Sequence, residues 1–238
     1  MLFLLLDQTI GKILRVLQRM LIPSPTLRFP TRISLFDEMH NLSVKSSAAY
    51  AAFYFKNALF FKTRESLWQY CKKNVKEFEG FIFEFGVHKG YSINFFSDLF
   101  PNFKIFGFDS FKGLEEDWGG FQIQMGTFNL NGKIPEVNNN VTLINGWFED
   151  TLPNFLKSFS TQVAVVHLDA DTYKPTIYVL NQIMGILGPG TIIIFDQFFG
   201  YTGYEEHEFK AWNEFTLDNE FKYKVLGYSE SAVAFQII

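Results

Sequence analysis

The sequence predicts an α/β protein built on a mostly parallel β-sheet with helices on both faces, and three observations support this fold class. Short apolar segments typical of buried strands alternate with helical segments through most of the 238 residues. The strand segments are nearly continuous apolar runs, as in sheets covered on both faces. The last two strand segments are joined by a connection too short for a crossover, so we expect them to pair antiparallel.

The first 45 residues are expected to form a helical N-terminal extension, and residues 46–238 the main domain. Met1–Ile22 places Lys12, Arg15 and Arg19 on one helical face and apolar side chains on another, as in an amphipathic helix. Its charges argue against a membrane span or a secretory signal. We expect this helix to pack within the chain or against a second copy, giving a homo-oligomer; contact with a membrane surface is the alternative. Pro23–Pro30 is expected to be a linker.

The elements of the main domain are predicted from apolar periodicity and from the positions of glycine and proline. Helices are expected at Ser46–Phe60, Thr63–Val75, Lys89–Phe100, Thr151–Phe159, Tyr173–Leu187 and Glu205–Asn219. Strands are expected at Phe81–Phe85, Lys104–Asp109, Val141–Trp147, Val163–Asp169, Thr191–Asp196, Lys222–Tyr228 and Ser231–Ile238. Pro153 falls in the first turn of its helix, where proline is tolerated.

Composition excludes some functions. Hydrophobic residues make up 47% of the chain, which is enough for a sizeable core, and the net charge of −4 gives no basic footprint for nucleic acid. Cys71 is the only cysteine, so no internal disulfide is possible, and this fits a cytoplasmic protein.

Acidic residues gather at the carboxyl ends of the predicted strands, where ligands bind in sheets of this kind. The first strand leads into the turn Gly86–Gly90, whose two glycines let the backbone approach a ligand. The next strand ends at Asp109, a carboxylate placed to accept ribose hydroxyls. Because the glycine turn and Asp109 follow consecutive strands, we interpret them together as a nucleoside-binding site. The three-glycine pattern of dinucleotide binders is missing, so a ligand without a diphosphate fits better. After the third strand, Trp147 or Phe148 offers a ring for a purine.

Three further carboxylates follow the fourth and fifth strands. Asp169 and Asp171 are two residues apart, so two like charges share one side of the chain unless a cation or a proton lies between them. Asp196 and the neutral Gln197 follow the next strand. Oxygen ligands of this kind suit Mg²⁺, and the simpler alternatives are that these acids form a solvated rim or cap helices. We interpret His167 as a hydrogen-bonded core histidine and not as a ligand.

Five segments in this order resemble the macrocin O-methyltransferase family of S-adenosylmethionine-dependent enzymes. They are FEFGVHKGYS, GFDSFKGL, GWFEDTLP, HLDADTYKPT and LGPGTIIIFDQF. The resemblance implies a Rossmann-like class I methyltransferase fold, with a seven-stranded sheet whose last strand is antiparallel. It also implies methylation of a hydroxyl of a sugar or glycosylated small molecule, with Mg²⁺ assistance.

The resemblance also assigns roles to individual positions. It implies that the cofactor is held by Glu84, Gly86, Gly90, Ser92, Asp109, Ser110, Trp147 and Phe148. It implies that Asp169, Asp196 and Gln197 bind the metal and that Asp171 is the general base. Gln197 departs from the family, which has a second acid here, and this should weaken Mg²⁺ binding. A cofactor-binding module without turnover is therefore one alternative function, and a nicotinamide-dependent oxidoreductase is another.

Overall fold

The computed structural model describes residues 34–238 except 77–78 and 121–122. The expected amphipathic helix at Met1–Ile22 and the linker at Pro23–Pro30 therefore lie outside the described residues. The homo-oligomer, the membrane-surface contact, the cytoplasmic location and the division at residue 45 stay predictions. Residues 39–238 form one compact unit. Within the described ranges, no helix combines the length and apolarity needed to cross a bilayer.

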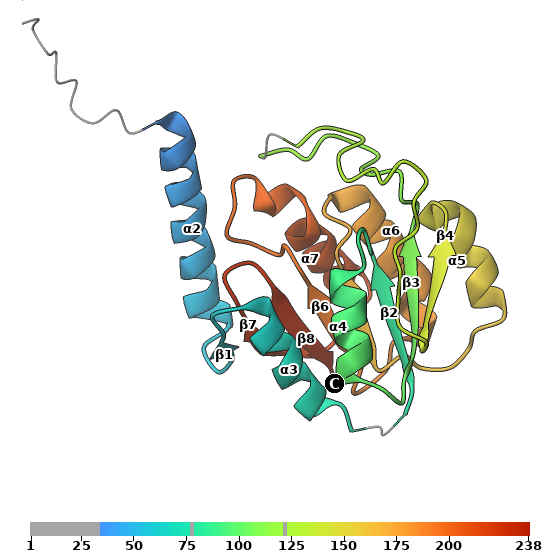
Figure 1. The fold of residues 1–238 in the computed structure, drawn as a ribbon. Helices are drawn as coiled ribbons and strands as arrows, with labels where there is room; N and C mark the ends of the chain where they lie inside the picture. The colour runs from blue at the N-terminus through green and yellow to red at the C-terminus, as the bar shows by residue number, and fades with distance from the viewer. Residues whose placement is uncertain (1–33, 77–78, 121–122) are drawn as a thin grey trace, which may run out of the picture. The chain divides into compact units, whose positions relative to one another are not determined.

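The described residues form one eight-stranded sheet, in the order β1-β7-β8-β6-β5-β2-β3-β4 (Figure 1). The strands are β1 (Leu59–Phe60), β2 (Phe81–Phe85), β3 (Lys104–Asp109), β4 (Val141–Asn145), β5 (Val165–Leu168), β6 (Ile192–Phe195), β7 (Tyr223–Tyr228) and β8 (Val233–Ile237). The neighbours from β4 to β6 are parallel, and β8 is antiparallel to both β6 and β7. The predicted fold class, including the antiparallel last strand, is confirmed, but the sheet has eight strands where seven were expected.

Helices cover both faces of this sheet. The α-helices are α2 (Leu35–Tyr54), α3 (Arg64–Asn74), α4 (Tyr91–Leu99), α5 (Phe148–Lys157), α6 (Tyr173–Ile183) and α7 (Glu208–Asp218), with short 3₁₀ turns η1 (Met184–Ile186) and η2 (Tyr204–Glu206). α3 and α4 contribute to one buried cluster, and α5, α6 and α7 to another. The alternation of side chains along each strand explains this: Ile82 belongs to the first cluster, whereas Phe83 and Phe85 belong to the second.

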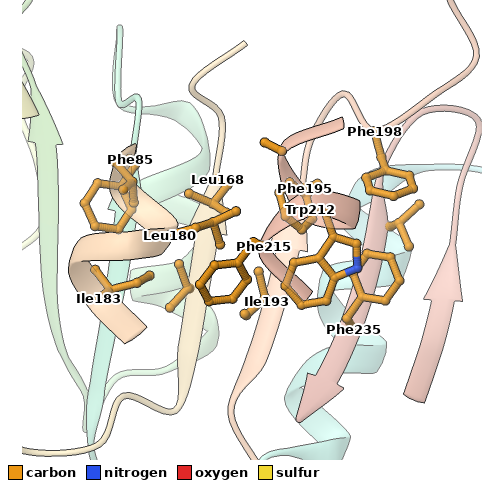
Figure 2. Close-up of a cluster of buried hydrophobic side chains, with 14 of the residues drawn as sticks. Phe85, Leu168, Leu180, Ile183, Ile193, Phe195, Phe198, Trp212, Phe215 and Phe235 are labelled. Carbon is orange, nitrogen blue, oxygen red and sulfur yellow. The ribbon is translucent and has the colours of Figure 1, made fainter. Parts of the chain in front are cut away.

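Large aromatic side chains fill the second cluster. Trp212 of α7 lies over the sheet against Phe195 of β6 and Phe235 of β8, with ring centroids 5.4 and 4.7 Å apart (Figure 2). All three side chains are fully buried. This packing fixes α7, and with it the residues that precede α7, against the end of β6.

The structure differs from the prediction between residues 55 and 60. The helix expected at Ser46–Phe60 ends at Tyr54, and Leu59–Phe60 form β1, which runs parallel to β7 at the edge of the sheet. A strand of two exposed residues carries no readable alternation. β1 is defined by its pairing with the free edge of β7. Because that edge forms only when the sheet is folded, β1 could not be predicted from the local sequence.

Candidate active site

A cavity of about 300 Å³ opens beyond the carboxyl ends of the central parallel strands. This is where ligands bind in open α/β sheets. Its lining includes Gly86 after β2, Asp109 and Ser110 at the end of β3, Trp147 and Phe148 after β4, and Asp169 and Asp171 after β5. We call the first five of these residues the cofactor wall. Asp169, Asp171, Gln197 and Arg64 also line the cavity, and together with Asp196, which is buried behind the lining, they form the acidic wall.

Backbone geometry builds the cofactor wall. Gly86 has φ of +90°, and a side-chain carbon there would lie 1.9 Å from the carbonyl oxygen of Asp169. Only glycine fits such a position. The Asp109 carboxylate accepts from the backbone N–H groups of Val87 and His88 at 2.8 Å, and from that of Phe111 at 2.6 Å. Of about four lone-pair sites on a carboxylate, roughly one is left for a ligand.

The other side of the cofactor wall is aromatic. Trp147 is the N-cap of α5 and Phe148 its first residue, and Phe148 is braced edge-on by Phe85 with centroids 5.5 Å apart. Ser110 lies nearby, where its hydroxyl accepts from Lys112 N at 3.1 Å. Apolar rings beside a small polar group suit a flat heterocycle with polar edges.

The structure places three of the predicted cofactor residues behind the cavity and not in its lining. Glu84 is fully buried, and its carboxylate accepts from the Ser92 hydroxyl at 3.0 Å and pairs with His167 Nδ1 at 3.0 Å. Gly90 caps α4 with φ of +82°. In this arrangement these residues support the turn, and their contact with a cofactor stays a prediction.

The acidic wall holds three neighbouring carboxylates, of which Asp171 and Asp196 are buried and Asp169 is partly exposed. Burial and the neighbouring charge of Asp196 raise the pKa of Asp169 to about 8. Burial and the charge of Asp169 likewise raise the pKa of Asp171 well above its ordinary value. Asp171 also has φ of +64°, which is unusual for a residue with a side chain. The structure therefore brings together the two carboxylates that the sequence singled out.

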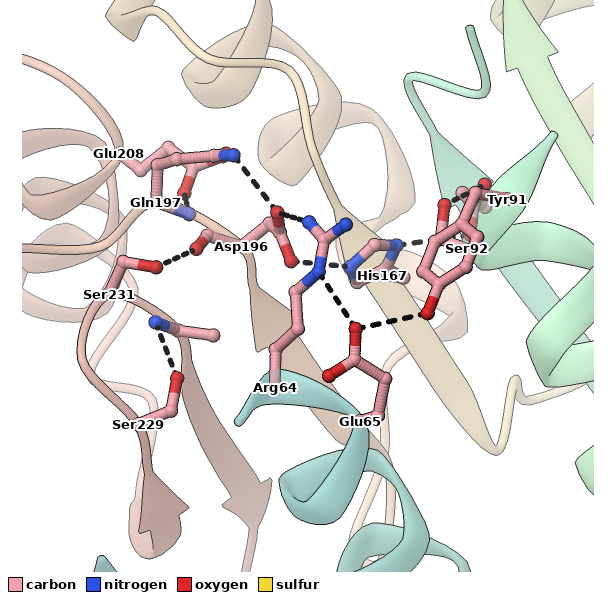
Figure 3. A network of polar contacts seen from close by, with 12 residues as sticks. Arg64, Glu65, Tyr91, Ser92, His167, Asp196, Gln197, Glu208, Ser229 and Ser231 are labelled. Carbon is pink, nitrogen blue, oxygen red and sulfur yellow. Dashed lines mark hydrogen bonds and ion pairs between the residues drawn. The ribbon is translucent and has the colours of Figure 1, made fainter. Parts of the chain in front are cut away.

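Asp196 differs from its neighbours because cations already surround it (Figure 3). Its Oδ2 accepts from Arg64 Nη1 and from Gln197 Nε2, and its Oδ1 lies 3.6 Å from His167 Nε2. Burial would raise the pKa of Asp196, but His167 and Arg64 more than offset burial and lower the pKa. Burial alone would lower the pKa of His167, but the neighbouring carboxylates of Asp196 and Glu84 raise it to about 10.

Asp196, one of the three predicted metal ligands, does not fit a magnesium ion while it is paired with Arg64. Both oxygens of Asp196 face cationic or N–H groups, and Gln197 turns its amide nitrogen toward that carboxylate. Across the described part of the chain, no three His, Cys, Asp or Glu side chains are grouped as a metal site. Asp196 Oδ1 and Gln197 Oε1 have no hydrogen-bond partner, but a divalent cation bound through them would stand beside the Arg64 guanidinium, which contacts the other oxygen of Asp196.

Sequence reasoning missed two residues of this region, Arg64 and Glu208. Arg64 begins α3 and lines the cavity. Glu208 begins α7, is fully buried, and accepts from Gln197 N at 3.1 Å. Burial and the charges of Asp169 and Asp196 raise the pKa of Glu208 well above its ordinary value. Each lies at a helix start, and neither follows a predicted strand, so the strand-end pattern gave no signal for them.

Comparison with known proteins identifies the kind of domain. The methyltransferase-domain family matches residues 83–198, the stretch from β2 to just beyond β6. Over 58 residues the chain is 38% identical to the 8-demethyl-8-(2,3-dimethoxy-alpha-L-rhamnosyl)-tetracenomycin-C 4'-O-methyltransferase of Streptomyces olivaceus. That match covers 24% of this chain and 21% of the relative, so the chain matches about a fifth of that protein's length.

Two solved structures share the fold over most of this chain. CalS11, a calicheamicin methyltransferase, has a TM-score of 0.59 at 20% identity, over 97% of this chain and 91% of that chain. The O-methyltransferase NovP has a TM-score of 0.54 at 20% identity, over 73% and 78%. At this identity the likeness concerns the fold alone. With the family match, it confirms the methyltransferase fold and the resemblance that the sequence motifs indicated.

Proposed function

We propose that this chain, which carries a methyltransferase domain and resembles the macrocin O-methyltransferases, transfers the methyl group of S-adenosylmethionine to a hydroxyl of a sugar or a glycosylated small molecule. One observation carries the proposal. The cofactor wall and the acidic wall line a single cavity, so a surface suited to a nucleoside and the carboxylates of Asp169 and Asp171 face the same space. Methyl transfer to a hydroxyl needs that combination.

The cofactor wall would hold the nucleoside part of the cofactor. Asp109 is fixed by three backbone N–H groups, so its remaining acceptor site is pre-oriented toward a ribose hydroxyl. Trp147 and Phe148 would contact the adenine, with Ser110 at its polar edge. S-adenosylmethionine supplies a methyl group on a positively charged sulfur, which is reactive without help from the protein.

The acidic wall would activate the acceptor. A sugar hydroxyl holds its proton tightly, and a nearby base must remove the proton as the oxygen attacks the methyl carbon. The O–CH₃ bond forms, the S–CH₃ bond breaks with its electron pair staying on sulfur, and the hydroxyl proton passes to Asp171. Asp171 suits this role because it is nine-tenths buried and still lines the cavity.

Two observations support a sugar as the methyl acceptor: the carboxylates that line the cavity and the similarity to the Streptomyces enzyme. Beyond Asp171, the lining includes Glu115 and Glu149, whose carboxylates accept hydrogen bonds from hydroxyl groups. The Streptomyces relative is, by its name, an enzyme that acts on a rhamnosyl compound. A polyhydroxylated acceptor fits both observations. The Mg²⁺ assistance that the resemblance implies stays a prediction, and no step above passes through a metal.

The test combines binding and turnover. S-adenosylhomocysteine should bind in a calorimetric titration, and methyl-labelled S-adenosylmethionine should label a panel of rhamnosides and other glycosides. Asp171→Asn should lower kcat by about 10²- to 10⁴-fold, because it removes the proton acceptor, while affinity for S-adenosylhomocysteine changes little. Asp218→Asn, at the exposed end of α7, is the matched control.

Two results would contradict the proposal. Tight binding of NADH with no binding of S-adenosylhomocysteine would assign the cavity to a dehydrogenase. Binding of S-adenosylhomocysteine with no labelling across the glycoside panel would leave a cofactor-binding module without this turnover.

A further inference from the structure

The acidic wall contains a cation supplied by the chain itself. Arg64 is the first residue of α3 and lies 132 positions before Asp196, yet its Nη1 donates to Asp196 Oδ2 (Figure 3). The helix start is fixed independently of this contact, because Thr63 caps α3 by accepting from Ser66 N at 3.2 Å. The fold therefore delivers the guanidinium to the end of β6.

The guanidinium is held from several sides. Its central carbon lies 5.2 Å from the ring centre of Trp68 and 5.7 Å from that of Tyr91. Its Nε lies 3.5 Å from Glu65 Oε1, and Glu65 in turn accepts from the Tyr91 hydroxyl at 3.2 Å. Arginine suits such a site because its planar group stacks on rings while it donates in plane. The Arg64 side chain is about one-third exposed, so the group borders the cavity without closing it.

Positive charge reaches Asp196 from two directions. Arg64 lies on the cavity side, and the fully buried His167 lies behind, with Nε2 3.6 Å from Oδ1. His167 also pairs with Glu84, so a chain of charges runs Glu84, His167, Asp196, Arg64 from the core to the cavity. A divalent cation at Asp196 would stand beside the guanidinium and be repelled by it.

We infer that Arg64 is the resident cation of this site, holding Asp196 in the position where related chemistry would use a divalent metal, so that methyl transfer by this chain proceeds without one. The inference rests on the proposed function for its catalytic part. Arg64 is a positioning residue, since it acts through Asp196. It offsets part of the repulsion that Asp196 exerts on Asp169, and it pairs with Asp196, which does not line the cavity. Proton removal then falls to Asp171, and the overall exchange still yields a methyl ether, S-adenosylhomocysteine and one proton.

The first test uses Mn²⁺ alone as the probe, followed by electron paramagnetic resonance, and it needs no acceptor. We expect the full-length parent to bind no Mn²⁺ at millimolar concentration. Arg64→Met should bind Mn²⁺ about tenfold more tightly or better, because a unit charge beside Asp196 and Asp169 is gone. Lys73→Met, on the exposed side of the same helix, loses the same charge away from the cavity and should behave as the parent.

The second test measures turnover in chelator. The parent should keep its full rate in EDTA, and Arg64→Lys should keep most of that rate and bind no Mn²⁺. Arg64→Met should lose about tenfold or more in kcat, and Mg²⁺ should restore part of that rate. Circular dichroism checks that each variant is folded; if Arg64→Met is not folded, Arg64→Gln takes its place.

Distinct results overturn the inference. Mn²⁺ binding to the parent, with turnover lost in EDTA and restored by Mg²⁺, would show that a metal displaces Arg64 from Asp196. If Arg64→Met binds Mn²⁺ no more tightly than the parent and has the same kcat, the ion pair between Arg64 and Asp196 affects neither metal binding nor turnover. If the parent binds no S-adenosylhomocysteine, the proposed function is refuted. The comparison of Mn²⁺ binding between the parent and Arg64→Met would still show whether Arg64 excludes a metal from Asp196.

Discussion

The cofactor wall and the acidic wall share one cavity, but they neutralise their carboxylates in different ways. On the cofactor wall, Asp109 accepts from three backbone N–H groups that lie within 22 positions of it. At the acidic wall, Asp196 depends on the side chains of Arg64 and His167, which lie 132 and 29 positions away. Asp169 and Asp171 respond to burial with raised pKa values.

The two kinds of carboxylate should differ in how well they tolerate substitutions of nearby side chains. A carboxylate held by backbone donors keeps its partners whatever side chains surround it. A carboxylate held by distant side chains loses its partner with one substitution, and an unpaired buried charge is costly. The acidic wall is therefore the part of the site that single mutations should alter most.

The largest effect is expected from His167→Met, which leaves Glu84 and Asp196 buried without the charge between them. We expect the free energy of unfolding to fall by about 3–5 kcal/mol, measured by urea denaturation. His40→Met, on an exposed turn of α2, is the control. A loss no larger than that of the control would mean that the two carboxylates need no cation.

The same residue gives a pH dependence with a defined sign. The pKa of His167 is raised from 6.5 to about 10 in the folded protein. A raised pKa stabilises the fold fully below about pH 6.5, and this stabilisation is lost as pH rises toward 10. The stability difference between the parent and His167→Met should therefore shrink across that interval.

A smaller effect is expected from Asp109→Ala on the cofactor wall. Three backbone N–H groups lose their acceptor, but the site borders the cavity and water can replace it in part, so we expect about 1–3 kcal/mol of lost stability. Affinity for S-adenosylhomocysteine should fall by about tenfold to a hundredfold, since one charged hydrogen bond is lost. Calorimetry measures this, with Asp218→Ala as the exposed control. If Asp109→Ala binds S-adenosylhomocysteine as tightly as the parent, Asp109 does not bind the ribose.

The smallest effect is expected from Trp147→Ala. Loss of one stacking ring should weaken S-adenosylhomocysteine binding by about tenfold, and Trp147→Phe should recover most of that affinity. Neither variant should change Mn²⁺ binding, since Trp147 belongs to the cofactor wall. Equal affinity for the alanine and phenylalanine variants would place the adenine elsewhere in the cavity.

The sequence by itself determined the layout of this protein. Periodicity placed the strands from β2 to β8 and the order of helices between them, because buried strands and amphipathic helices leave local patterns. The turn at Gly86, the acid ending β3 and the aromatic pair after β4 could also be predicted to lie at the ligand-binding edge of the sheet, because each lies at the end of one strand. The resemblance to a known family then supplied the cofactor.

Tertiary structure alone decided the partners of those residues. Nothing in the neighbourhood of Arg64 indicates that its guanidinium reaches Asp196, and nothing near Glu208 indicates that it receives Gln197 N. Glu84 was expected to hold the cofactor; the fold pairs it with His167, and its contact with a cofactor stays a prediction. The physical reason is range: apolar periodicity and turn chemistry act over a few residues, whereas ion pairs join whichever side chains the packing of sheet and helices brings together.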